Sequence, residues 1–151
     1  MSKQKNVFVN RQAFYNYHVM ERYEAGLSLM GTEIKSIRDG KADLRGSYAK
    51  ANGHELWLFG THVASYDAGG INNHDPKRPR KLLLHKAEIE DITAKLSQKG
   101  LTLVPLRLYV KKHWAKVELG LAKGKRKYDK RRVIIERERD REARRAVRHS
   151  T

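Results

Sequence analysis

The 151-residue sequence contains no cysteine, which excludes disulfide frameworks, cysteine-ligated zinc sites and thiol catalysis. It has no run of 18 apolar residues, so no membrane-spanning helix is predicted. No apolar run follows the lysines of the first six residues, so no secretory signal is expected. We therefore predict a soluble, cytoplasmic protein with one domain and an appendage.

Signatures of enzymatic sites are also scarce. Residues 120–125 place three residues between two glycines where a P-loop needs four, and no G-x-G-x-x-G occurs. The seven histidines are scattered, and none forms an H-x-x-x-H pair. His85 and Glu88 are three residues apart, but an ordinary helix start explains them better than a metal site. We predict a non-enzymatic protein with no catalytic residue, no metal, no cofactor and no small-molecule substrate.

The sequence has few acidic residues for its number of basic ones. The chain has 33 Lys and Arg against 17 Asp and Glu, a net charge of +16. Such an excess favours a polyanionic partner, with nucleic acid ahead of an anionic membrane. Residues 124–151 hold twelve Lys and Arg and five Asp and Glu. We therefore predict an RNA-binding domain over residues 1–123 and a basic C-terminal tail over residues 124–151.

The apolar pattern of residues 1–123 predicts a mainly β domain. Residues 17–24 favour a strand, and Asn52-Gly53 between residues 46–50 and 55–59 predicts a hairpin. Leu106, Leu108 and Val110 alternate with Arg107, Tyr109 and Lys111, and Val117, Leu119 and Leu121 alternate in the same way with Lys116, Glu118 and Gly120. This alternation predicts a second hairpin with one buried face. No alternation of strands and helices indicates a parallel sheet. We therefore predict a closed antiparallel barrel of about six strands, because closure leaves no free sheet edges.

Two or three short helices accompany these strands. Residues 33–38 are expected to form a helix capped by Thr32 and ended by Gly40. Residues 86–99 carry apolar side chains at helical spacing before Gly100. Residues 66–81 are expected to form a long loop.

Basic and aromatic residues are the strongest candidates for contacts with RNA. Residues 76–86 hold five Lys and Arg and no acid, and a run of this kind neutralises phosphates. Beside it, Leu82, Leu83 and Leu84 fit a buried strand, although one of them could remain exposed to a base. Trp114 is the best candidate for stacking on an unpaired base.

The tail has no apolar stripe. Its apolar residues 133–135 are consecutive, so a helix there would have no face to dock on a core. Two interpretations of the tail remain: a solvated helix, or a segment that becomes ordered when it binds a polyanion.

Several stretches together resemble the SmpB family of SsrA-binding proteins. The motifs are YEAGL at 23–27, GTEIKSIR at 31–38, GKA at 40–42, RKLLL at 80–84, GLAKGK at 120–125 and YDKR at 128–131. The resemblance implies an oligonucleotide-binding-type barrel that binds transfer-messenger RNA and a tail that acts on the ribosome. The predicted RNA-binding residues are Asn10, Glu24, Lys35, Arg38, Lys41, Arg78, Arg80, Lys81, Leu83, Trp114 and Lys116. The predicted ribosome-binding residues of the tail are Gly124, Lys125, Lys127, Tyr128, Asp129, Lys130 and Arg131.

The expected function is that of an adaptor in trans-translation. Its barrel would bind the tRNA-like part of the RNA, and its tail would probe the empty mRNA channel at the decoding region of the small ribosomal subunit. The alternative is a generic basic RNA-binding or ribosomal protein of the same fold. A peripheral protein of anionic membranes fits less well, because no amphipathic helix is evident.

Overall fold

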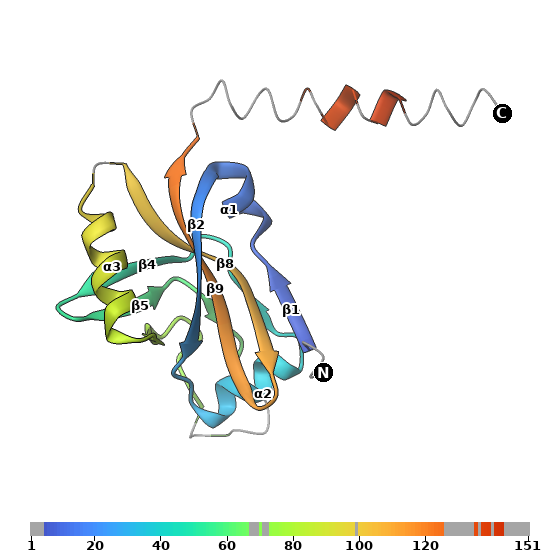
Figure 1. The fold of residues 1–151 in the computed structure, drawn as a ribbon. Coiled ribbons are helices and arrows are strands. Elements are labelled where there is room, and N and C mark those ends of the chain that lie inside the picture. Colours follow the sequence, from blue (N-terminus) through green and yellow to red (C-terminus); the bar gives the residue numbers. More distant parts are fainter. Residues whose placement is uncertain are drawn as a thin grey trace.

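The computed structural model describes residues 5–66, 70, 73–98, 100–125, 135, 137–139 and 141–143. Its main feature is a closed ring of antiparallel strands in the order β8, β4, β5, β7, β2 and β9, with β9 pairing again with β8 (Figure 1). A further strand, β1, pairs with β8. The strands of this sheet are β1 (Lys5–Val9), β2 (Tyr17–Leu27), β4 (Tyr48–Asn52), β5 (Glu55–Phe59), β7 (Arg80–Leu83), β8 (Leu101–Lys111) and β9 (Trp114–Gly124).

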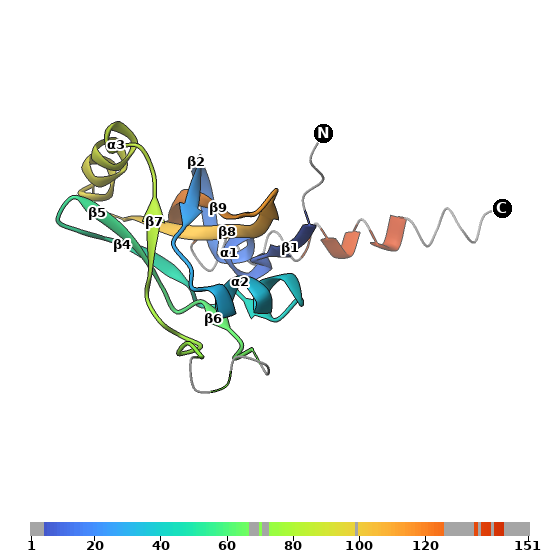
Figure 2. The same cartoon turned by 90° about the horizontal axis from the view of Figure 1, so that it is seen from below.

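Shorter elements surround the barrel. They are the helices α1 (Arg11–Asn16), α2 (Gly31–Arg38) and α3 (Lys86–Leu96) and the two-stranded pair β3 (Ala42–Asp43) and β6 (His62–Val63). Figure 2 shows α3 on one side of the ring, apart from α1 and α2. Among the described helices, none is both long and apolar enough to cross a membrane. The predicted mainly β class and antiparallel barrel are confirmed.

Both predicted hairpins are present. Asn52 pairs with Glu55 across the first turn, where Gly53 has a φ of 63°. A positive φ costs a glycine little, which explains the strong Asn-Gly signal. The second hairpin joins β8 to β9 through Lys112, a non-glycine residue with a φ of 58°.

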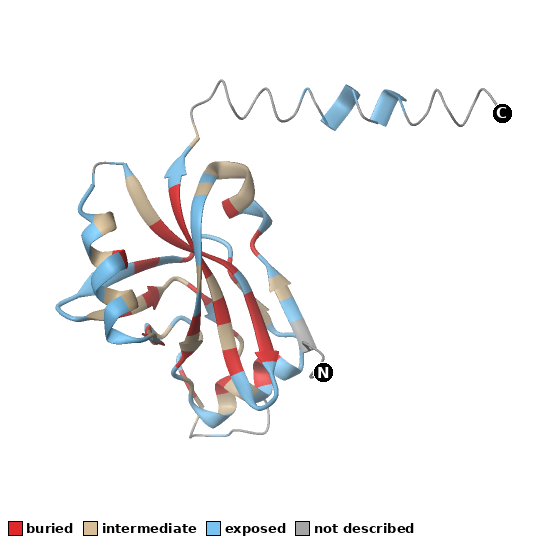
Figure 3. Cartoon of the chain, in the orientation of Figure 1, coloured by how far each residue is buried: buried red, intermediate tan, exposed pale blue. Residues whose placement is uncertain are grey.

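The second hairpin corrects the prediction of a single buried face. Pro105 pairs with Leu119 and Arg107 with Glu118, so β8 has one extra residue at this point. Such a bulge reverses the alternation of side chains. Leu106 therefore packs in a cluster with Ala13, Val104 and Ala122, whereas Leu108 and Val110 join the main core. The two faces together make β8 and β9 the most buried part of the barrel (Figure 3).

Two further predictions of local structure need correction. The long loop ends at Pro79, because Arg80–Leu83 forms β7 between β5 and β2. The N-cap of α2 is Met30 rather than Thr32, whose hydroxyl instead contacts Nδ1 of His74 at 2.8 Å. The sequence patterns also did not predict β1 or α1, which are too short for a clear periodicity.

Candidate nucleic-acid interface

Four predicted RNA-binding residues meet in one open hollow beside the N-terminus of α3. Gly26 of β2 pairs with Leu83 of β7 on one side and with Lys116 of β9 on the other. The three strands therefore bring together segments that are far apart in the sequence. The hollow, here called the β2–β7 hollow, is lined by Glu24, Gly26, His54, Glu55, Lys81, Leu82, Leu83, Leu84, His85, Glu88, Ile89 and Lys116.

An exposed leucine lies over a glycine in this hollow. The side chain of Leu83 is 47% exposed, whereas Leu82 beside it is buried at 1%. A Cβ atom added at Gly26 would lie 3.3 Å from Cβ of Leu83. The missing side chain at Gly26 thus lets Leu83 lie flat against β2. An apolar surface held in this way suits contact with the face of a base.

Glu24 is exposed at the rim of the hollow, and a buried tyrosine holds its carboxylate in place. It accepts a hydrogen bond from the hydroxyl of Tyr109, a residue that is only 5% exposed. Burial and this hydrogen bond raise the pKa of Tyr109, so its hydroxyl remains a donor at neutral pH. The remaining lone pairs of Glu24 can accept hydrogen bonds from a base edge or a ribose hydroxyl.

The β2–β7 hollow is not strongly basic. Lys81 and Lys116 line it together with Glu24, Glu55 and Glu88. Lys81 also forms an ion pair with Glu55, with 3.2 Å between the charged atoms. A surface with this balance is poorly suited to binding phosphates alone. It is better suited to contacts with bases or sugars.

The tip of the β8–β9 hairpin offers positive charge and an aromatic ring. Trp114 is 68% exposed and pairs with Lys111. Lys112 and His113 are exposed between them. Because Trp114 and Lys116 are two residues apart on one strand, their side chains point to the same face. The hairpin tip therefore extends the surface around the β2–β7 hollow.

Three comparisons identify relatives of the chain. The family model described as SmpB protein matches residues 7–149. The chain belongs to the SmpB family. An SsrA-binding protein of Carboxydothermus hydrogenoformans is 52% identical over 145 residues, which cover 96% of this chain and 97% of that protein. Another from Desulforudis audaxviator is 54% identical and covers 96% and 95% of the two chains. A solved chain described as "tmRNA-SmpB: a journey to the center of the bacterial ribosome" is 47% identical, with a TM-score of 0.69 over 85% of this chain and 94% of its own.

In this SmpB-family chain, three basic candidates lie away from the β2–β7 hollow. Lys35 and Arg38 are exposed on α2, and Lys41 follows that helix. The Lys35 ammonium lies 5.5 Å from the centre of the Tyr66 ring. None of the three lines the hollow. A contact between these residues and RNA remains a prediction.

Arg80 was predicted to contact RNA, but its side chain is completely buried and reaches no surface. Its guanidinium donates hydrogen bonds to the carboxylate of Glu33 and to the carbonyl oxygens of Thr61 and Pro76. Arg78 is partly exposed but also binds Glu33. Burial opposes ionisation of Glu33, but hydrogen bonds from Arg78, the Met30 amide and Arg80 outweigh it and lower the pKa of Glu33. The two arginines fix the segment before β7 onto α2.

Asn10 also has a structural role in place of the predicted RNA contact. Asn10 is only 3% exposed, and its side-chain oxygen accepts a hydrogen bond from the Ala13 amide at the start of α1. Its amide nitrogen donates to the carbonyl oxygens of Leu44, at 3.3 Å, and Pro105, at 2.9 Å. All of these groups are therefore already paired within the fold.

Replacing Asn10 should consequently destabilise the protein. Asn10→Ala removes a helix cap and the side-chain donor to the Pro105 carbonyl, while the Leu44 carbonyl keeps the Ser47 amide as a donor; the loss should cost about 1–3 kcal/mol. Urea unfolding followed by circular dichroism measures this change. If the variant is as stable as the parent but binds one RNA selectively less well, the structural interpretation is wrong.

The predicted tail residues fall into two groups. Gly124 pairs with Tyr17 at the end of β9. The backbone amide of Lys125 donates to the Asn16 carbonyl at 2.7 Å, and its Nζ donates to the Phe14 carbonyl at 3.2 Å. Both acceptors belong to α1, so this helix fixes where the chain leaves the barrel. Lys127, Tyr128, Asp129, Lys130 and Arg131 lie outside the described residues.

Gly26 and Tyr109, which support the interface, are among the residues that were not predicted as site residues. Gly26 carries no side chain, so only its pairing with Leu83 reveals its importance. Tyr109 fits a stacking residue by its type, but it is buried and supports Glu24. Among the described residues, no group of three or more His, Asp or Glu side chains is placed to bind a metal ion.

Proposed function

We propose that the chain is a non-enzymatic RNA-binding adaptor of trans-translation that acts in the cytoplasm. The barrel, residues 1–123, binds the tRNA-like part of transfer-messenger RNA. The tail, residues 124–151, acts on the stalled ribosome and probes the empty mRNA channel in the decoding region. The adaptor role requires no cofactor and no small-molecule substrate.

The observation that carries this proposal is the β2–β7 hollow in a chain of this family. Glu24, Leu83, Lys81 and Lys116 come from three strands and form one surface with acceptors, an apolar platform and cations. Relatives that match nearly the full chain are named SsrA-binding proteins. The similar solved chain belongs to work on tmRNA-SmpB and the bacterial ribosome.

The tail supplies the second half of the proposal. It carries twelve Lys and Arg against five Asp and Glu, a composition suited to a channel lined with phosphates. As a helix, the 26 residues beyond Lys125 would span about 39 Å at roughly 1.5 Å per residue. The proposed contacts with the ribosome are those of Gly124, Lys125, Lys127, Tyr128, Asp129, Lys130 and Arg131.

Removing the apolar platform should weaken binding to transfer-messenger RNA. Leu83→Ala should raise the Kd for its tRNA-like domain by about tenfold or more, which corresponds to roughly 1.4 kcal/mol. Gly26→Ala should act in the same direction, because its new Cβ, 3.3 Å from Cβ of Leu83, forces Leu83 to shift by a few tenths of an ångström. Fluorescence anisotropy with the labelled RNA domain measures both effects.

Two controls make this test specific. Gly31→Ala is the matched glycine control, since a Cβ at that position meets nothing within 4 Å. Glu24→Gln should weaken binding without changing the slope of log Kd against log salt, because the carboxylate binds no phosphate. Equal losses for transfer-messenger RNA and an unrelated RNA would contradict a selective role for the hollow.

A further inference from the structure

An acidic side chain lies beside the cation of Lys81 on the outer face of the barrel. One carboxylate oxygen of Glu55 lies 3.2 Å from the Lys81 ammonium, and the other accepts a hydrogen bond from the Trp57 indole nitrogen at 2.9 Å. Glu55 and Lys81 both line the β2–β7 hollow, whereas Trp57 does not. The three residues are here called the Glu55 cluster.

The pairing of β5 with β7 brings these three side chains to one face. Trp57 pairs directly with Lys81. Glu55 precedes Trp57 by two residues on β5, so their side chains point to the same side of the sheet. Leu56 between them is completely buried, which places that side outside the barrel. Glu55 and Lys81 are therefore diagonal neighbours, a separation that long side chains can bridge.

The Glu55 cluster holds the carboxylate in one place and keeps it ionised. An exposed ion pair is normally weak, because two long side chains must be ordered to form it. Here the Trp57 indole binds the second carboxylate oxygen, so Glu55 is already ordered when Lys81 meets it. Hydrogen bonds from Trp57 and Lys81 also lower the pKa of Glu55. The side chain of Lys81 is 42% exposed, so its charge is matched by Glu55 and is still accessible from solvent.

The second lysine of the hollow is arranged differently. Lys116 comes from β9, and within the described part of the chain it forms no ion pair. Its ammonium is therefore available to the phosphates of any RNA. One hollow thus contains one paired lysine, Lys81, and one unpaired lysine.

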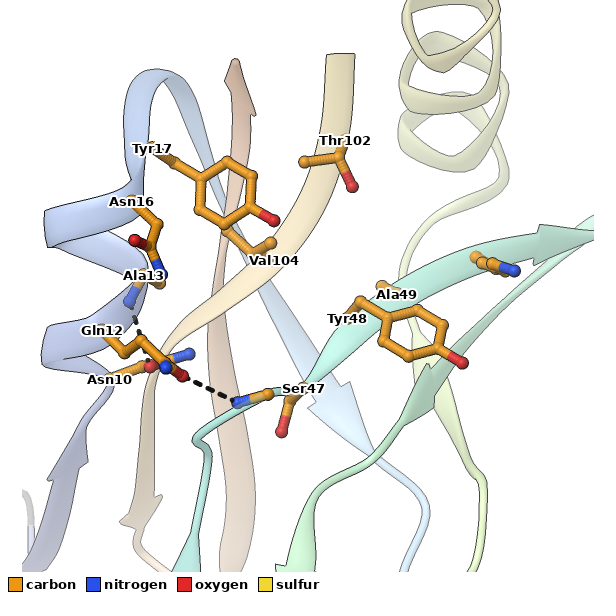
Figure 4. Close-up of a pocket in the computed structure, with 12 residues that line it drawn as sticks. Asn10, Gln12, Ala13, Asn16, Tyr17, Ser47, Tyr48, Ala49, Thr102 and Val104 are labelled. Carbon is orange, nitrogen blue, oxygen red and sulfur yellow. Dashed lines mark hydrogen bonds between the residues drawn. The ribbon is translucent and has the colours of Figure 1, made fainter. Parts of the chain in front are cut away.

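Acidic residues do not accompany lysine in every hollow of the barrel. A second hollow lies between α1, the start of β4 and the start of β8 (Figure 4). None of the described residues that line it is Asp or Glu, and Lys50 is the one charged residue among them. By contrast, Glu24, Glu55 and Glu88 line the β2–β7 hollow. Negative charge is thus present in the hollow proposed to bind RNA, although the whole chain carries a net charge of +16.

An acid in an RNA-binding surface weakens the general attraction to phosphates, and weaker binding of wrong partners is one way to gain selectivity. We propose that Glu55 determines selectivity for the tRNA-like domain by keeping Lys81 paired and so unavailable to other RNAs. This inference rests on the proposed function. An RNA whose shape fits the hollow brings a phosphate to Lys81 where Glu55 holds it, whereas other RNAs meet a neutral pair. Glu55 is a positioning residue that acts through Lys81.

The test compares the full-length parent with Glu55→Gln on two labelled probes, the tRNA-like domain and an unrelated single-stranded RNA. Glutamine keeps an oxygen that can accept from the Trp57 indole, so the variant mainly removes charge. The released Lys81 should add one phosphate contact to the unrelated RNA. Its slope of log Kd against log salt should steepen by about 0.7, and its Kd should fall by about three- to tenfold at about 0.1 M salt. The Kd for the tRNA-like domain should change less than about twofold, because Lys81 already reaches that RNA in the parent. Fluorescence anisotropy over a series of KCl concentrations measures both probes.

Two further variants separate the ion pair from net charge. Asp91→Asn raises the net charge equally, but Asp91 lies outside the hollow and Lys95 keeps its ion pair with Glu21. Both Kd values of this control should stay within about twofold of those of the parent, because salt screens a distant exposed charge. In a chain that already carries Lys81→Gln, Glu55→Gln should leave the salt slope unchanged, because the lysine that it would release is absent.

Three results would overturn the inference. They are equal tightening of both RNAs by Glu55→Gln, a gain that persists without Lys81, and a loss confined to the tRNA-like domain, which would mean that the carboxylate contacts RNA itself. A parent that binds both probes equally well would instead count against the proposed function. The salt slopes on the unrelated RNA would then still decide whether Glu55 keeps Lys81 from phosphates.

Discussion

Glu33→Ala should destabilise the barrel by about 3–5 kcal/mol, the usual cost of leaving a buried charge without its partner. Glu33 and Arg80 both have completely buried side chains, and Arg80 has no other carboxylate bonded to it among the described contacts. The substitution also removes the acceptor for the Met30 amide at the start of α2. Denaturant unfolding of the parent and the variant measures the difference.

An exposed ion pair gives the matched control. Arg45→Ala removes a pair with Asp43 in which the arginine side chain is 77% exposed, and should change the free energy of unfolding very little. Glu33→Gln keeps the shape but loses the charge, so its effect should lie between the two. If Glu33→Ala proved as harmless as Arg45→Ala, the cluster would not stabilise the fold.

The same cluster predicts the direction of acid sensitivity. The pKa of Glu33 is lower in the folded protein than its ordinary value of 4.5. Its ionised form therefore stabilises the fold fully above that ordinary value, and this stabilisation is lost as the pH falls towards the folded pKa. Unfolding curves should accordingly show a smaller difference between the parent and Glu33→Gln at acidic pH than at neutral pH.

Deleting the tail beyond Lys125 should abolish tagging of stalled chains while leaving the barrel folded. Residues 126–151 contain eleven Lys and Arg and five Asp and Glu, so their loss should weaken RNA binding only modestly and without selectivity. The cut falls after Lys125 because this residue is bonded to α1. A reconstituted tagging assay should show a loss of at least an order of magnitude, with a melting temperature close to that of the parent.

A point-mutant set distinguishes specific residues from general charge. Replacing Asp129, Lys130 and Arg131 together by alanine should reproduce most of the tagging defect. Replacing Arg144, Arg145 and Arg148 by alanine removes more positive charge and serves as the control with a smaller expected effect. A truncated protein that still tags stalled chains would contradict the role of the tail.

Local signals in the sequence predicted much of the barrel. Asn52-Gly53 defines a turn by its own backbone preferences, and the alternation along β9 follows from its buried face. The face of Leu106 could not be read in this way, because the bulge near Pro105 is visible only in the pairing of β8 with β9. A strand as short as β7 is likewise recognised by its neighbours rather than by its own four residues.

Site residues could be predicted where their place on a strand or turn indicated an exposed side chain. They could not be predicted where a side chain pairs with a residue far away in the sequence. Leu83 and Trp114 are exposed, as their proposed contacts with bases require. Arg80 belongs to the same basic run as Lys81, yet it binds Glu33, which is 47 positions away in the sequence. Charge composition alone cannot separate an arginine that meets RNA from one that is buried in an ion pair.

The RNA that co-purifies with the chain from bacterial cells tests the central claim most directly. Sequencing this RNA for the parent, for Leu83→Ala and for the protein ending at Lys125 compares the barrel with the tail in one experiment. Transfer-messenger RNA should be strongly enriched with the parent and with the truncated protein, and much less with Leu83→Ala. Recovery of cellular RNAs in proportion to their abundance, equally for all three proteins, would contradict the account.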